Sequence, residues 1–115
     1  MNVELTRFKV KEGKSAKVDE WLSFLHENMD ELEDGLIIEK MYVETIFREV
    51  LDGTEYLYWY SVQGIDGLPI EDNTNWIAKK HLQYWDECID PTFGAVDLKT
   101  EVVMIPKKVR ASMDF

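Results

Sequence analysis

Cysteine is nearly absent from this chain of 115 residues, which contains a single one, Cys88. One thiol excludes a disulfide within the chain and fits a reducing compartment. Positive charge is also scarce, because 13 Lys and Arg residues stand against 23 Asp and Glu residues and leave a formal net charge of −10. Nucleic acids and anionic membrane surfaces are bound through Lys and Arg. We therefore expect no nucleic-acid partner and no membrane partner.

Sequence features that would mark a location or a chemistry are missing as well. No apolar run approaches the roughly 20 residues of a membrane-spanning helix. The first residues have neither the basic nor the apolar region of a signal peptide, so we expect a cytoplasmic protein. The chain has no phosphate-binding glycine loop, no paired-cysteine metal motif and no Gly-x-Ser-x-Gly motif. Its two histidines, His26 and His81, fall in different predicted helices, and we expect neither a metal site nor a cofactor.

What the chain does have is the composition of one globular domain. Apolar residues make up 45% of it and charged residues 31%. A chain of this length buries roughly two-thirds of its unfolded surface, which is enough for one core. We expect a single domain over residues 1–106 and a short basic tail over residues 107–115, which Val109, Met113 and Phe115 would anchor.

The stretch from residue 41 to residue 62 predicts a β-hairpin around which the rest of the chain is organised. Both arms are rich in aromatic and β-branched residues, and Asp52-Gly53 between them is a two-residue turn signal. In that register Glu44 lies opposite Ser61, whereas a three-residue turn would shift the pairing of the two strands by one residue. One face then collects Tyr42, Glu44, Ile46, Arg48, Leu57, Trp59 and Ser61, and the other collects Met41, Val43, Thr45, Phe47, Tyr56, Tyr58, Tyr60 and Val62. Neither face is polar, so we expect both to be covered.

Two further strands and two helices are predicted around the hairpin. Residues 3–10 and 97–105 alternate as strands do, and Pro106 ends the second run. The order strand, helix, strand, strand, helix, strand predicts a ferredoxin-like βαββαβ fold of the α+β class, a four-stranded antiparallel sheet with both helices on one face. Since the helices cover one face, we expect the other face to meet a partner in a homodimer.

The first helix is predicted between Ser15, its N-cap, and Gly35, just beyond its C-terminus. Its apolar positions share one face and are Val18, Trp21, Leu22, Leu25, Met29 and Leu32. The second helix is predicted from a cap at Asp72 or Asn73 to about Ile89. These patterns place Trp21 in the core.

Three segments together resemble an uncharacterised bacterial family within the superfamily of dimeric α/β-barrel proteins. They are Met41-Tyr42-Val43-Glu44, Tyr56-Leu57-Tyr58-Trp59-Tyr60, and His81-x-x-Tyr84-Trp85-x-Glu87-Cys88. The resemblance implies a ferredoxin-like homodimer. The wider superfamily includes cofactor-free monooxygenases, haem-degrading enzymes, sugar mutarotases and stress-responsive dimers, in which ligands often lie between helices and sheet. Fold alone selects none of these activities.

The resemblance to haem-degrading members puts a helical histidine near His81. Those enzymes also use an asparagine on the first strand, where this chain has Thr6 and Arg7. We therefore expect no stoichiometric haem complex. From the residues alone, His81 is either a general base or a hydrogen-bonded core histidine. Both interpretations stay open at this point.

The candidate pocket consists of five residues: Glu44, Tyr58, Tyr60, His81 and Trp85. His81 and Trp85 are one helical turn apart, and the two tyrosines alternate on one strand, so we expect these four to meet between helix and sheet. Glu44 would be a further polar wall, although the register places it on the opposite sheet face. The tyrosines either orient a ligand or fill the core.

The sequence thus predicts a homodimer that binds a small organic molecule between helices and sheet. A cofactor-free reaction of the monooxygenase or isomerase type on that molecule is one interpretation. The alternative is a non-catalytic structural or stress-responsive dimer. Polar groups that converge on one cavity would favour the first, and the same groups dispersed and satisfied by neighbours would favour the second.

Overall fold

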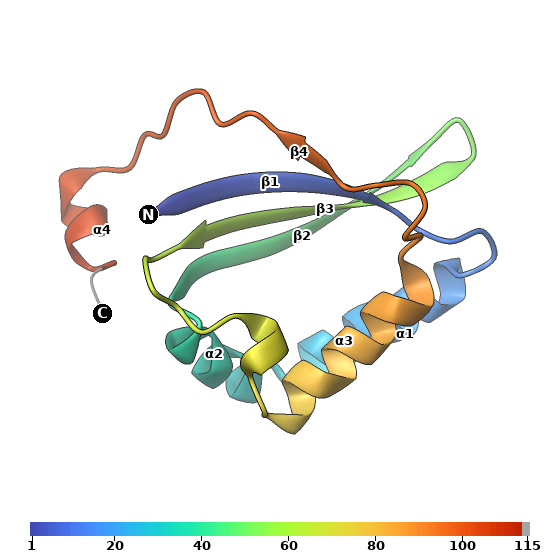
Figure 1. Ribbon diagram of the computed structural model, residues 1–115, viewed down its shortest axis with the longest axis horizontal. Coiled ribbons are helices and arrows are strands. Elements are labelled where there is room, and N and C mark those ends of the chain that lie inside the picture. Colours follow the sequence, from blue (N-terminus) through green and yellow to red (C-terminus); the bar gives the residue numbers. More distant parts are fainter. Residues whose placement is uncertain (114–115) are drawn as a thin grey trace.

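The computed structural model describes residues 1–113 as a four-stranded antiparallel sheet with helices packed on one face (Figure 1). Its elements in chain order are β1 (Asn2–Lys9), α1 (Ser15–Glu27), α2 (Met29–Ile38), β2 (Met41–Leu51), β3 (Thr54–Gln63), the 3-10 turn η1 (Ile70–Asp72), α3 (Trp76–Cys88), β4 (Val96–Leu98) and α4 (Lys107–Ala111). The strand order β2-β3-β1-β4, antiparallel throughout, is the ferredoxin-like order that was predicted. Phe115 lies outside the described residues.

The predicted two-residue hairpin turn is confirmed. Asp52 and Gly53 have φ of 51° and 78°, and both values lie in the left-handed region that a type I′ turn requires. The register that follows places Glu44 opposite Ser61, as expected. The hairpin therefore depends on local backbone chemistry that can be read along the chain.

Strand pairing decides which sheet face the helices cover. Phe8 pairs with Leu57 and Thr6 pairs with Trp59, so these side chains share a face. Trp21 of α1 packs on that face with its ring 5.6 Å from the ring of Trp59. Trp21 and Leu57 are completely buried. The covered face therefore carries the set that includes Glu44 and Trp59, and the tyrosines of β3 lie on the other face, called the open face below.

The single long helix predicted from residue 15 to residue 35 is in fact two helices. Asn28 leaves the helical conformation with φ −118° and ψ 27° and donates its side-chain amide to the carbonyl of Phe24 at 2.8 Å. Such local side-chain bonding competes with the helix and bends it. Gly35 does not end the helix but lies inside α2; Lys40, with φ 52°, reverses the chain instead and donates its N–H to Ile37.

Both predicted N-caps are displaced. Ser15 is the first residue of α1, and its hydroxyl donates to Glu55 at 2.8 Å rather than capping the helix. Asn75 caps α3, accepting from the N–H of Ile77 at 2.8 Å. Asn73 is occupied elsewhere, because its amide donates to a carboxylate oxygen of Glu39 at 2.9 Å. The side chains expected to cap the helices are thus hydrogen-bonded to residues distant in the chain.

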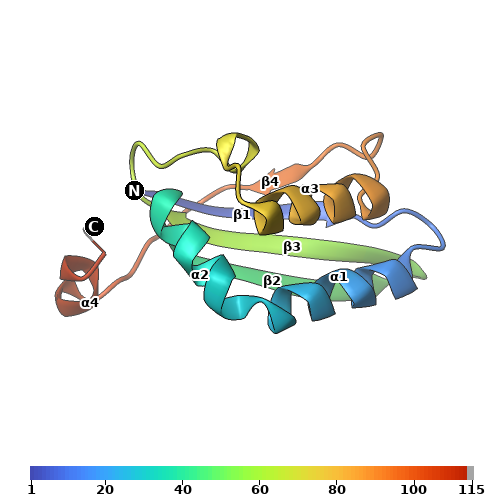
Figure 2. The same cartoon turned by 90° about the horizontal axis from the view of Figure 1, so that it is seen from below.

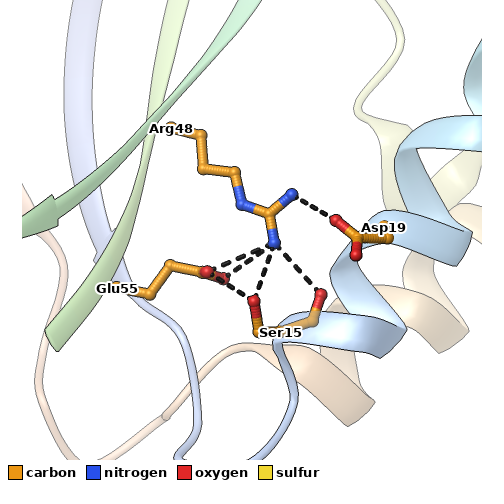
Figure 3. Close-up of polar contacts among 4 residues, drawn as sticks. All are labelled: Ser15, Asp19, Arg48 and Glu55. Carbon is orange, nitrogen blue, oxygen red and sulfur yellow. Dashed lines mark hydrogen bonds and ion pairs between the residues drawn. The ribbon is translucent and has the colours of Figure 1, made fainter. Parts of the chain in front are cut away.

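A cluster around Arg48 joins the hairpin to the start of α1 (Figure 3). Its guanidinium donates to Asp19 at 2.6 Å, to the carbonyl of Ser15 at 3.0 Å and to Glu55 at 3.2 Å. Arg48 lies on the covered face, where its charge is satisfied by two acids. The cluster orients α1 across the sheet and so places Trp21 over the core.

The last strand is shorter than the run from residue 97 to residue 105 predicted. β4 pairs with β1 at three positions, Leu5 opposite Leu98 being the last. Residues 2–4 of β1 pair with β3 but not with β4. Thr100 makes the next link through its hydroxyl, which donates to the carbonyl of Val3 at 2.6 Å. The chain beyond leaves the sheet, and α4 lies apart from it (Figures 1 and 2).

We predict that Trp21→Ala lowers the free energy of unfolding by ~3–5 kcal/mol, because it removes a fully buried indole and leaves a cavity. The measurement is urea denaturation followed by circular dichroism. Trp76→Ala is the matched control, since that indole is 55% exposed and should cost little. Trp21→Phe serves if the alanine variant does not fold. Equal midpoints for the Trp21 and Trp76 variants would contradict the placement of Trp21.

Candidate functional site

A cavity of about 390 Å³ lies between the covered sheet face and the helices. Its volume is within the ~300–1,000 Å³ usual for small-molecule sites. The break at Asn28 makes room for it, because α2 turns away from the direction of α1 (Figure 2). The apolar part of its wall consists of Leu22, Leu25, Met29, Leu32, Leu36, Ile46, Trp59, Ile70, Ile77 and Ala78.

His81 of α3 is 7% exposed and lies on this wall. Its Nδ1 accepts a hydrogen bond of 2.9 Å from the indole N–H of Trp21. Burial lowers the pKa of His81 to about 4, so the ring is neutral at pH 7. Since Nδ1 is an acceptor, the single proton of the neutral ring sits on Nε2. His81 is thus both a core histidine and a candidate site residue: Nδ1 is hydrogen-bonded to Trp21, and Nε2 remains as a donor.

Glu44 of β2 lines the same cavity. One carboxylate oxygen, Oε1, accepts from the indole N–H of Trp59 at 2.6 Å. Burial raises the pKa of Glu44, and the hydrogen bond from Trp59 opposes this in part. The register had already placed Glu44 on the Trp59 face, and the structure shows that this is the face with the cavity.

Two polar atoms are left for a ligand. Within residues 1–113, Arg7 Nε is the one fully buried side-chain nitrogen or oxygen that has no hydrogen-bond partner. Glu44 Oε2 and His81 Nε2 also make no hydrogen bond within that part of the chain, but these two atoms are not fully buried. Both residues line the cavity, so these atoms are the ones left to bind a ligand there. One is an acceptor or an acid according to its protonation, and the other is a donor.

A second carboxyl, Glu39, was not found from the sequence. It is 6% exposed, lines the cavity and accepts from the amide of Asn73 at 2.9 Å. Burial raises its pKa most, and the charge of Glu44 raises it further. A Cβ at Gly67 would lie 2.0 Å from the carbonyl oxygen of Glu39, so glycine there lets the loop pass against the end of α2. The sequence signal was weak, because Glu39 follows the predicted helix without any motif.

A second cavity, of about 450 Å³, adjoins the first. The two share Glu44, Trp59, Ile70 and His81. Trp85 lines the second cavity, with its ring 5.1 Å from the ring of Trp59 in an edge-to-face contact. The predicted association of His81 with Trp85 on one side of α3 agrees with this arrangement.

The structure does not bring Tyr58 and Tyr60 to these cavities. Both lie on the open face, and the Tyr58 hydroxyl donates to Glu49 at 2.7 Å. The alternation of β3 was read correctly, but the helices cover its other side. Trp59 occupies the place that the tyrosines were expected to take.

Cys88 is a completely buried free thiol whose pKa is raised by burial, which makes it a poor nucleophile. In the part of the chain that the structure describes, no three His, Cys, Asp or Glu side chains form a group suited to a metal ion. In the same residues no helix is long and apolar enough to cross a membrane.

Comparison with known proteins supports the fold. The chain is similar to an L-rhamnose mutarotase from Formosa agariphila, with a TM-score of 0.54 and 19% sequence identity over 93% of this chain and 100% of that protein. At this identity the likeness shows a shared fold alone. No curated protein matches the chain. A family model described as a family of unknown function (DUF6176) matches residues 1–111, and the chain therefore belongs to the DUF6176 family.

Proposed function

We propose that this protein binds a small organic molecule between helices and sheet, and that Glu44 and His81 carry a cofactor-free proton transfer on it. The observation that supports the proposal is that Glu44 and His81 line one cavity, each with a polar atom, Oε2 and Nε2, that has no hydrogen-bond partner among the described residues. Burial shifts the pKa of each group toward its neutral form, and such shifts are frequent at catalytic sites. Trp59 and Trp85 provide aromatic walls.

The two groups have different parts in the proposed reaction. Glu44, as carboxylate, removes a proton from the substrate, and the electron pair moves toward a substrate oxygen. The neutral imidazole of His81 polarises that oxygen by donating a hydrogen bond from Nε2. Protonated Glu44 then returns the proton at a second position. The net change is an isomerisation, which consumes no oxidant, and its class agrees with the mutarotase activity named for the similar structure.

We predict that the protein accelerates proton exchange in at least one class of small carbonyl compound or hemiacetal, and that Glu44→Gln slows this by roughly 10²–10⁴-fold. The measurement is exchange NMR over aldoses, amino sugars and alkyl ketones. Gln keeps an acceptor for the Trp59 indole, so the fold should persist. Glu49→Gln is the control, on the same strand but the open face.

Two results would count against this reaction. The first is an equal rate for the wild type and Glu44→Gln. The second is no acceleration over the whole panel together with no bound molecule in native mass spectrometry of freshly isolated protein. In either case the non-catalytic alternative is preferred.

The pH dependence of stability follows from the buried imidazole. The unfolded chain has a histidine pKa of about 6.5, and His81 in the folded protein has a pKa of about 4. As the pH falls between these values, the unfolded state binds the proton first. The contribution of neutral His81 to the free energy of unfolding is therefore fully present above pH ~6.5. It falls by roughly 3 kcal/mol as the pH is lowered to ~4.

Glu39 and Glu44 have raised pKa values, so their protonation stabilises the folded protein as the pH falls and opposes the effect of His81. The prediction therefore compares the pH dependence of variants with that of the wild type. Urea denaturation from pH 7 to pH ~4 should show a smaller loss for His81→Gln than for the wild type. His26→Gln, an exposed histidine on α1, should keep the wild-type dependence. The same pH dependence in all three proteins would show that His81 is not buried as a neutral ring.

A homodimer is the second part of the proposal, formed through the open face, with a cytoplasmic location. Exposed apolar side chains on that face and on the segment after β4 support it; they include Phe47 at 54%, Val102 at 70% and Met104 at 85%. Residues 99–113 also carry four basic residues and one acidic residue, a charge opposite to that of the chain as a whole. A second copy would be a complementary surface for this segment.

We predict a dimer at low micromolar concentration in sedimentation equilibrium, with a total interface of ~2,000 Å² or more. Phe47→Glu should shift it toward monomer because it places a charge in an apolar contact. Ile37→Glu, at a 60% exposed position of α2 on the helical side, should leave the mass unchanged. A monomeric wild type would refute the dimer.

A further inference from the structure

Resting on the proposed binding cavity, we propose that its ligand is a small organic cation, a protonated amine with an apolar body, rather than an anion or an uncharged molecule. Three features of the described residues support this: the sign of the charges on the two cavity walls, the position of the carboxyl groups, and the aromatic surface beside them.

The charged side chains on the walls of both cavities are acids. Glu31, Glu39 and Glu44 line the first cavity, and Glu4, Glu44 and Glu71 line the second. Among the described residues, no Lys or Arg lines either one. A carboxylate or phosphate ligand would lose its hydration without gaining a counter-charge, which is costly in a site of low dielectric. The walls thus select against anions.

Glu39 and Glu44 give a cation a specific place. Both line the first cavity, Glu39 buried and Glu44 half-buried, and the charge of Glu44 raises the pKa of Glu39. Asn73 and Trp59 each satisfy one oxygen of this pair. The remaining oxygens can accept from an ammonium group, which replaces the lost hydration with charge-assisted hydrogen bonds and relieves the repulsion between the two acids.

The rest of the ligand finds an apolar and aromatic surface. Trp59 lines both cavities and stands next to Glu44, and Trp85 follows in the second cavity. An ammonium near an indole face gains cation–π attraction. An aliphatic body would extend along the wall formed by Leu32, Leu36 and Ile77. A net charge of −10 also concentrates cations near the protein and repels anions.

The test compares three ligands with the same tail: hexylammonium, 1-hexanol and hexanoate, titrated by calorimetry at pH 7 and low salt. We expect hexylammonium to bind at least roughly tenfold more tightly than 1-hexanol, and hexanoate to bind most weakly. The affinity for hexylammonium should also fall as the pH is lowered below 7, because a cation favours the ionised carboxyls. Equal binding of the amine and the alcohol, or tighter binding of hexanoate, overturns the proposal.

Variants locate the preference. Glu44→Gln and Glu39→Gln should each reduce the ratio of amine to alcohol affinity while 1-hexanol still binds, and circular dichroism checks that each variant is folded. Glu49→Gln, a carboxyl lost from the open face, should keep the wild-type ratio. An unchanged ratio in both cavity variants would overturn the assignment of the ammonium to these acids.

The ligand class and the proposed function fail in different ways. Ala78→Trp fills the wall of the cavity with a bulky ring. If no ligand binds the wild type, or if Ala78→Trp binds all three as well as the wild type does, the binding cavity is refuted and the ligand class with it. If Ala78→Trp blocks binding but the alcohol or the carboxylate equals the amine, the cavity stands and the cation is refuted.

Discussion

The hydrogen bond from the Trp21 indole to Nδ1 of His81 is the interaction on which the rest of the site depends. It joins α1 to α3 across the covered face, inside the core, where a lost partner would leave a buried polar atom unsatisfied. It also fixes the tautomer of the ring, because an accepting Nδ1 leaves the proton on Nε2. The contact that closes the core therefore leaves Nε2 of a cavity-lining histidine as a donor, and the hydrogen bond from Trp59 likewise leaves Oε2 of Glu44 as an acceptor.

Desolvation shifts the pKa values of the acids and the histidine of the site and makes their burial energetically costly. Burial raises the pKa of Glu39 and of Glu44, the charge of Glu44 raises the pKa of Glu39 further, and each carboxyl keeps one hydrogen bond. A protein selected for stability alone would place apolar groups there, because buried acids are expensive unless paired. Their presence beside a cavity, together with a neutral buried histidine, is the pattern expected of a site that binds a ligand or moves a proton.

The fold was predictable because most of its signals are local or periodic, whereas the site was predictable in part. His81, Trp85 and Glu44 could be chosen from the sequence because a polar residue on an apolar helix face or strand is conspicuous. Tyr58 and Tyr60 were chosen by the same alternation that correctly paired the strands, but strand period alone does not say which face a helix covers. Glu39 has no sequence pattern, since its importance comes from burial against a loop distant in the chain.

The hairpin, the order of the elements and the ferredoxin-like topology could be read along the chain, because turn geometry and hydrophobic period depend on neighbouring residues. The covered face, the break in the first helix and the end of the last strand depend instead on contacts between residues far apart in the chain. Those outcomes depend on competition for partners: the Asn28 amide bonds to the turn before it, Asn73 bonds to Glu39, and Thr100 reaches β1 through its hydroxyl and not through the backbone ladder. The cavity also depends on tertiary structure, because it lies where α2 turns away from the direction of α1.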